Sequence, residues 1–574
     1  MKLPDECRNL EDIRAELDRI DSLIITALGK RLDYVKGAAA FKADEKSIPA
    51  PDRVAVMLTQ RRTWAQQAGL DPDFIEKTFS EVIAWFIEQQ IFHFRSKALG
   101  THGQTIDHGG LLQALNVGHE RATLLARPVL VSLTQRIDRI DPVKLFDAAR
   151  KCAGQSFLWA QGSPEFAIVS IDTAQALEAQ GAQRFQQVLA GWRNLLDQAL
   201  IDQPDNVPGV GPVLSGGFCF DPEQTRTPLW HDFADASLIL PRLQLSNSMD
   251  ASHLTLNVVI EAHQEPRLEA ERLGQLWRNV LDQAKADAQA EAVAEPWRFQ
   301  DVLPAEQWKQ LVREVTATIN TGSMQKVVLA REVQAQRSRP CAIRQSLERL
   351  RDMSPRAYLF AISRGEHCFF GATPERLVRL DAKQVEVTAL AGTSRRGAIE
   401  AEDLALGEQL LASVKDRHEH ALVVAMLRST LDAFCKDLDI PSEPTLLKLK
   451  NVQHLYTPIA GNLRADTNLL DLVAALHPTP AVGGLPRAAA LEYLHTHEQL
   501  DRGWFAAPVG WIDAQGDGEF AVALRSALVT GNHASLFAGC GIVGDSDPES
   551  EFAETALKLR AMMFALGQED RQSR

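Results

Sequence analysis

The chain has 574 residues and a mass of 63.4 kDa, too large for one compact core, so we expect two or more domains. Its net charge of −14 argues against a nucleic-acid binder, and no apolar run of about 18 residues predicts a membrane span. The acidic start lacks the apolar core of a signal peptide, and the scattered cysteines form no CxxC, so a cytoplasmic protein is expected.

The first 98 residues, called the head, predict three helices. Apolar residues at spacings of three and four indicate a long amphipathic helix from about residue 10 to beyond residue 35: Ile13, Leu17, Ile20, Ile24 and Leu28. Prolines at 49 and 51 end that pattern, and further helices are expected over residues 51–67 and from residue 71. Such helices cannot bury all their apolar faces alone, so we expect an intertwined homodimer.

Polar side chains are widely spaced along the head. Arg14 and Arg31 are 17 positions apart, about 25 Å along a helix axis. One small ligand could contact an Arg14 and an Arg31 together only if the helix of a second copy runs antiparallel to the first. Lys42, Arg53 and Gln90 would complete a cationic pocket for a small dicarboxylate; the alternative is that these side chains are solvated surface groups.

The head segment DIRAELDRIDSLIITALGKRLDYVKGAAAFK, with IPAPDRV and WFIEQQI after it, resembles the helical chorismate mutase class, and most of all its isochorismate pyruvate lyase branch. The resemblance covers residues 4–96. It implies that five residues contact substrate, with Lys42 catalytic: Arg14, Arg31, Lys42, Arg53 and Gln90. Donors alone can hold two carboxylates and a breaking ether oxygen for a pericyclic reaction. Ala50 and Val54 replace acidic residues typical of the mutases, which favours the lyase, with mutase side activity.

Residues 99–114 are polar and glycine-rich and predict a flexible linker. Residues 115–574, called the body, alternate short strands with amphipathic helices, and hairpins and a meander dominate after residue 300. We therefore predict an all-α head joined to an α+β body with large antiparallel sheets. Neither GxGxxG after a strand nor GxxxxGK[ST] occurs.

Two predicted helices of the body carry pairs of carboxylates. Asp416 and Glu419 are three residues apart, and Glu551 and Glu554 repeat that spacing, so each pair shares a helix face. Facing helices of this kind predict an oxygen-rich site for Mg²⁺. The alternatives are solvated acidic faces, or zinc at the adjacent HEH sequence, whose histidines point to different sides of the helix.

Nine motifs over residues 320–565 follow the order found in chorismate-utilising enzymes, a family that includes isochorismate, anthranilate and salicylate synthases: KVVLAR, FFGATPERL, ALAGTSRRG, KDRHEH, VQHLYTPIAG, HPTPAVGG, VALRSALV, FAGCGIV and ESEFAETALK. Residues 115–320 resemble the divergent front half of that family. The resemblance implies that Lys326 is the general base that activates water for attack at C2. It also implies that Glu375 is the general acid that protonates the departing C4 hydroxyl.

The same resemblance implies Mg²⁺ binding by Glu419 and Glu554, with Asp416 and Glu551 as outer carboxylates acting through metal-bound water. Four residues would hold the enolpyruvyl carboxylate: Arg525, Lys558, Gly539 and Gly541. Four others would contact the ring: Gly392, Thr393, His454 and Ala481. The structural alternatives are that the glycines only serve turns and that the histidine is a hydrogen-bonded core residue.

These patterns predict a bifunctional enzyme with Mg²⁺ as cofactor. The body would convert chorismate to isochorismate, and the head would eliminate pyruvate from isochorismate to leave salicylate. One alternative is a chorismate mutase head on a body that makes salicylate by itself. Another is an inactive head that serves dimerisation or regulation. Partners are expected to be these small molecules and a second copy of the chain, without nucleic acid or membrane.

Overall fold

The computed structural model describes residues 6–7, 9–38, 51–98, 103–162, 165–205, 207–249, 251–286, 295–397, 399–448, 452–465 and 467–568. The chain divides into two compact units, Met1–Gly103 and Gln104–Arg574, here the head unit and the body unit. Within the described part, no helix has the length and apolar content needed to cross a lipid bilayer.

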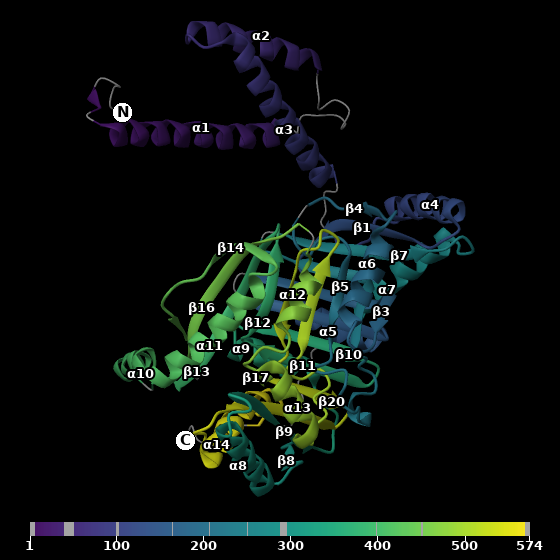
Figure 1. Cartoon of the computed structure of the whole chain (residues 1–574). Coiled ribbons are helices and arrows are strands. Elements are labelled where there is room, and N and C mark those ends of the chain that lie inside the picture. Colours follow the sequence, from purple (N-terminus) through teal and green to yellow (C-terminus); the bar gives the residue numbers. More distant parts are fainter. Residues whose placement is uncertain are drawn as a thin grey trace. The chain divides into compact units, whose positions relative to one another are not determined.

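The head unit is helical, as predicted (Figure 1). It contains α1 (Leu10–Ala38), α2 (Pro51–Gln67) and α3 (Pro72–Ala98). Gly69 follows α2 with a φ of 72°, a left-handed conformation that glycine adopts without strain. The apolar stripe of α1 stays exposed in the single chain: Leu17 is 55% and Ile24 is 53% exposed. This helix therefore leaves an apolar face without a partner in its own chain.

A first layer of strands forms one side of the body unit. Its pairing runs β4–β1–β7–β6–β3–β2–β10–β11–β20–β21–β9, and β9 also pairs with β8 and β17. In chain order these strands are β1 (Val129–Ile137), β2 (Gln155–Gly162), β3 (Glu165–Ala179), β4 (Leu200–Asp202), β6 (Ala236–Asn247), β7 (Ser252–Ile260), β8 (Arg298–Asp301), β9 (Lys326–Gln336), β10 (Tyr358–Arg364), β11 (His367–Thr373), β17 (Gly484–Leu485), β20 (Ser526–Thr530) and β21 (His533–Ile542).

A second layer branches from β6, because β5 pairs with the first part of that strand while β7 pairs with its last part. The pairing continues β5–β18–β19–β12–β13–β16, and β16 also pairs with β14 and β15. These strands are β5 (Val213–Phe218), β12 (Arg376–Asp381), β13 (Gln384–Arg395), β14 (Cys435–Asp439), β15 (Thr445–Lys448), β16 (Val452–Leu463), β18 (Pro508–Asp513) and β19 (Gly518–Val522). Among the described strands only β1–β4 is parallel, which confirms the predicted antiparallel architecture.

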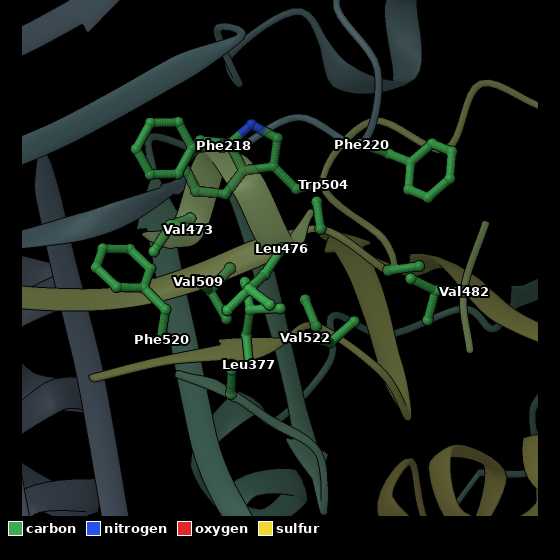
Figure 2. Packing of buried hydrophobic residues seen from close by; sticks show 14 of the residues in the cluster. Phe218, Phe220, Leu377, Val473, Leu476, Val482, Trp504, Val509, Phe520 and Val522 are labelled. Carbon is green, nitrogen blue, oxygen red and sulfur yellow. The ribbon is translucent and has the colours of Figure 1, made fainter. Parts of the chain in front are cut away.

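Two apolar cores explain why the first layer reads as nearly continuous hydrophobic sequence. Along β10, Phe360 belongs to one core, while its neighbours Leu359 and Ala361 belong to the other. Successive side chains of a strand point to opposite faces, so this layer is covered on both sides. Figure 2 shows the core between the layers, where side chains from α12, β12, β18 and β19 meet.

The helices of the body unit cover these layers. One group packs on the outer core of the first layer: α4 (His108–Leu125), α5 (Pro142–Cys152), α7 (Pro266–Ala286), α9 (Ile343–Met353) and α14 (Pro548–Ala565). A second group contributes to the inner core: α6 (Arg184–Leu196), α8 (Ala305–Asn320), α11 (Val414–Leu431), α12 (Leu469–Leu476) and α13 (Arg487–His497). The remaining helix is α10 (Glu400–Ala412), and a short 3₁₀ helix spans Pro228–Trp230.

Helix α4 begins inside residues 99–114, the segment predicted as a flexible linker. Its N-cap Asp107 accepts hydrogen bonds from the backbone of Gly109 and Gly110, each at 3.1 Å. Leu111 and Leu115 on this helix are buried. The glycines that suggested a loop therefore belong to a capped first turn, and apolar burial overrides their low helix propensity.

Candidate active site

One cavity of the body unit gathers most of the residues expected to serve the synthase: Lys326, Glu375, Gly392, Thr393, Glu419, His454, Ala481, Arg525, Gly539, Gly541, Glu554 and Lys558. They come from β9, β13, β16, β21, α11, α14 and the loops between strands. Asp416 and Glu551 do not line this cavity.

Lys326 opens strand β9 and is largely buried, with 12% of its side chain exposed. Its Nζ donates to Oε1 of Glu419 on α11 at 2.6 Å. Gly541 on β21 makes room for this lysine, because a Cβ there would lie 2.5 Å from Lys326 Cε. This glycine therefore shapes the space for the proposed base, and its φ is not in the left-handed region.

Glu375 lies in the turn between β11 and β12. Its backbone N–H donates to Thr373 Oγ1 at 3.2 Å, and its carbonyl accepts from Val522 N–H at 3.0 Å. Burial raises the pKa of its carboxyl to about 7, although three cations oppose that shift: Lys326, Lys558 and Arg525. A substantial fraction of Glu375 is therefore protonated near neutral pH, as a proton donor requires.

Glu554 on α14 is the third carboxylate of the cavity, after Glu419 and Glu375. It accepts from Lys558 Nζ at 2.7 Å, one helical turn away, and the same Nζ donates to the carbonyl of Gly539 at 2.9 Å. Burial would raise the pKa of Glu554, but Lys558, with Arg525 and Lys326 nearby, outweighs burial and lowers it. The carboxyl is consequently ionised near neutral pH and can bind a cation.

The two carboxylates expected to lie farther out each accept a hydrogen bond from a serine. Ser413, the N-cap of α11, donates its hydroxyl to Asp416. Ser546 donates to Glu551 at 2.7 Å. Both side chains thus stabilise helix N-termini, where negative charge is favoured.

A loop and a bulge place the remaining polar groups around the cavity. Arg525, between β19 and β20, has a φ of 49°, an uncommon conformation for a side chain with a Cβ, and burial lowers its pKa. Gly392 lies at a register shift of β13, where a Cβ would approach Asp416 Cβ to 3.0 Å. Thr393 Oγ1 is 3.0 Å from Nδ1 of His454. Burial, with cationic neighbours, lowers the pKa of His454 to about 4, so this ring is neutral at pH 7.

A buried ion pair in the wall of the cavity, Glu498 with Arg502, was not predicted from the sequence. Arg502, 1% exposed, binds Glu498 through Nε and Nη2 at 2.6 and 2.8 Å. It also donates to the carbonyls of Val328 and Val482 at 2.6 and 2.9 Å, and Glu498 accepts from the Ala330 N–H at 2.8 Å. The pair therefore ties β9 to the loop that contains Ala481. The i, i+4 spacing was its only sequence signal, and exposed helix pairs share it.

The structure does not gather the predicted substrate-contacting residues of the head unit around one described cavity. Arg14 and Arg53 are exposed, whereas Arg31 stacks on Phe86, with 4.3 Å from its guanidinium carbon to the ring centroid. Burial and Arg61 lower the pKa of Arg31, and its buried Nη1 has no hydrogen-bond partner among the residues that the structure describes. Gln90 lies on α3, but its side chain is outside the described part, as is Lys42 altogether.

Comparisons with known proteins agree with this two-part organisation. Residues 116–567 match the model of the chorismate binding enzyme family, and residues 13–91 match that of chorismate mutase type II. The salicylate biosynthesis isochorismate synthase of Pseudomonas aeruginosa is 42% identical over 466 residues, 79% of this chain and 94% of that protein. The isochorismate synthase MenF of Bacillus subtilis is 37% identical over 451 residues, covering 77% and 94%.

Among solved structures, that of MenF, the menaquinone-specific isochorismate synthase from Escherichia coli, aligns with a TM-score of 0.64 at 26% identity. The alignment covers 79% of this chain and 100% of that one. Sequence and fold thus point to the same family. The chain belongs to the chorismate binding enzymes and also carries an N-terminal domain of the chorismate mutase type II family.

Proposed function

We propose that the body unit converts chorismate to isochorismate and that the head unit then converts isochorismate to salicylate and pyruvate. The observation that carries the first step is that Lys326 and Glu375, whose pKa is raised to about 7, line one cavity. Relatives at 42% and 37% identity over most of the body unit are named as isochorismate synthases, which supports the same reaction here.

In the proposed first step, Lys326 removes a proton from a water molecule whose oxygen bonds to C2 of the ring. The ring double bonds shift, the C4–O bond breaks, and Glu375 gives its proton to the departing hydroxyl, which leaves as water. One water is consumed and one is released, so the product is an isomer of the substrate. Arg525 and Lys558 supply positive charge for the substrate carboxylates.

The donor set of the cavity fits Mg²⁺. Glu419 and Glu554 offer carboxylate oxygens from two helices, line the cavity, and have 32% and 43% of their side chains exposed. When bound there, Mg²⁺ would anchor a substrate carboxylate and offset its charge. In the described structure each of these carboxylates forms an ion pair with a lysine of the cavity, Glu419 with Lys326 and Glu554 with Lys558.

For the second step, the unpartnered guanidinium nitrogen of Arg31 supports an anionic ligand in the head unit. A buried donor without a partner is costly, and a substrate carboxylate would satisfy it. The exposed apolar stripe of α1 supports a homodimer, in which a second copy covers that face. Val54 and Ala50 favour elimination of pyruvate over the mutase reaction.

Product analysis with chorismate and Mg²⁺ tests both steps. The native protein should release salicylate and pyruvate in equal amounts. Lys326→Ala should lower isochorismate formation by about 10²–10⁴-fold yet still convert supplied isochorismate. Lys42→Ala should accumulate isochorismate.

Two outcomes would contradict this assignment. Prephenate as the main product would show a mutase head. Salicylate formed at the native rate by Lys42→Ala would show that the body unit makes it alone.

Removing Mg²⁺ with EDTA should stop the first step and leave the second unchanged.

A further inference from the structure

A histidine–aspartate–histidine cluster lies on the body unit outside the catalytic cavity. His231 and Asp232 directly follow the short 3₁₀ helix Pro228–Trp230, and His367 opens strand β11. His231 Nε2 is 2.9 Å from Asp232 Oδ1, and His367 Nδ1 is 2.8 Å from Asp232 Oδ2. The ligand atoms of the three side chains all lie within 4.8 Å of one another, and no other such group occurs among the described residues.

The hydrogen bonds of His231 leave two acceptor atoms of this cluster facing each other. Its Nδ1 is 3.1 Å from the carbonyl oxygen of Pro228, which can only accept, so this nitrogen carries a proton. In the neutral ring, Nε2 is then a lone pair facing a carboxylate oxygen. Two acceptors at 2.9 Å need a cation between them, either a second proton on the ring or a metal ion. Metal-binding histidines commonly donate their other N–H to a backbone carbonyl in this way.

The surrounding structure holds the three ligands in place. Trp230, next to His231, is 1% exposed and lies 5.1 Å from Phe369 of β11 between ring centroids. Arg364 donates to the backbone carbonyl of Asp232 at 2.8 Å. The carboxylate of that aspartate thus remains directed at the two imidazoles.

We propose that His231, Asp232 and His367 bind a divalent transition metal of the zinc class, linking the loop after the 3₁₀ helix to the β10–β11 hairpin. Two imidazoles and one carboxylate suit zinc, whereas Mg²⁺ prefers oxygen ligands. Tetrahedral zinc at ~2.0–2.1 Å separates its ligand atoms by roughly 3.3 Å, so small side-chain rotations suffice. His231 is 58% exposed, which leaves water access to a fourth position.

This site is separate from the catalytic cavity, which none of the three residues lines. His367 and Thr373 lie at opposite ends of β11, six positions apart, or about 20 Å at ~3.4 Å per residue, and Glu375 lies in the turn beyond Thr373. The bound metal therefore stabilises the fold without entering the reaction, and its loss leaves isochorismate synthesis intact.

Co²⁺ and Zn²⁺ titration of chelator-treated full-length protein, in excess Mg²⁺ to occupy the catalytic cavity, tests the proposal. The native protein should bind one Co²⁺ more per chain than His367→Gln or His231→Gln, with a visible absorption spectrum typical of low coordination number. Zn²⁺ should raise its Tm and leave the Tm of both variants unchanged. His263→Gln is the matched control, because that exposed histidine contacts only Glu261, at 3.3 Å, among the interactions described.

Isochorismate formation within about twofold of native in every variant will show that the proteins are folded. The proposal is overturned if native protein and His367→Gln bind equal amounts of Co²⁺, or if neither binds any, since the cluster is then an imidazolium–carboxylate network only. Asp232→Asn provides a second measurement, because it keeps the side-chain shape and should weaken Co²⁺ binding at least tenfold.

Discussion

At the scale of single residues, Glu375 shows how one cavity sets opposite protonation states. Burial penalises its carboxylate more than three nearby cations favour it, so its pKa rises to about 7. Glu554 is affected by the same three cations, but its side chain is 43% exposed and bonds directly to Lys558, and its pKa falls. Burial and the direct ion pair together therefore set different protonation states for the two carboxyls.

The pH dependence of the first step should follow Glu375. The free enzyme has the acid in its active, protonated form below about pH 7 and loses it as the pH rises through that value. We expect kcat/KM for isochorismate formation to fall about tenfold per pH unit on the alkaline side. Glu375→Gln should remove this limb along with most of the activity. An alkaline limb that persists at the same pH in this variant would assign the titration to another group.

Gly541 should be needed for activity because it leaves space for the side chain of Lys326, and not because its backbone requires a glycine conformation. The added Cβ of Gly541→Ala would lie 2.5 Å from Lys326 Cε, so the lysine must move. We expect kcat/KM to fall by about 10²-fold with little change in Tm, since a displacement near 1 Å can cost that much. Gly154→Ala is the control, because nothing lies within 4 Å of its added Cβ. Equal activity of the two variants would contradict this role.

At the scale of elements, the pairing of β9 with β21 brings Lys326 beside the glycines of the cavity. Another part of the cavity wall, at Ala481 and Val482, depends on a loop, and the Glu498–Arg502 pair fastens that loop to β9. Arg502 is thus a positioning residue. Its guanidinium touches backbone carbonyls on both elements, and a lysine could not reproduce these directed hydrogen bonds.

Arg502→Met should lower the free energy of unfolding by about 3–5 kcal/mol, because it leaves a buried carboxylate without its partner. It should also lower kcat more than it changes KM, since Lys326 and Ala481 lose their common support. Arg337→Met is the matched control: this buried arginine follows the far end of β9, and its loss should destabilise the protein without changing kcat. Denaturant unfolding and steady-state kinetics measure both quantities. A native kcat in folded Arg502→Met would show that the pair is only structural.

At the scale of the whole molecule, the two units should separate functionally. The body unit begins at Gln104, whose carbonyl accepts from Trp277 Nε1 at 2.6 Å, so a chain starting there keeps this contact. We expect residues 104–574 to form isochorismate from chorismate at a rate within about twofold of native but to make no salicylate. If α1 forms the dimer, light scattering should also show a monomer. Salicylate release by this truncated chain would contradict the division of labour.

Much of this architecture follows from local patterns. Apolar periodicity predicted the head helices, because one helix face repeats every three to four residues. Short apolar runs predicted the strands. The glycines before Leu111 wrongly predicted a flexible linker, because an N-cap and apolar burial outweigh the low helix propensity of glycine. Motif order named the residues that line the cavity, although their chemical roles stay predictions.

The sequence by itself determined the two-part composition and which side chains could do chemistry, since periodicity and motif order are local properties of the chain. Only the tertiary structure decided which of them face one cavity. Asp416 and Glu551 have the same spacing from Glu419 and Glu554, yet neither lines the cavity, and each accepts a hydrogen bond from a serine near a helix start. Arg502 contacts Val328 across 174 positions of sequence. Such assignments depend on long-range packing, which fixes burial and therefore charge state, and no local pattern contains that information.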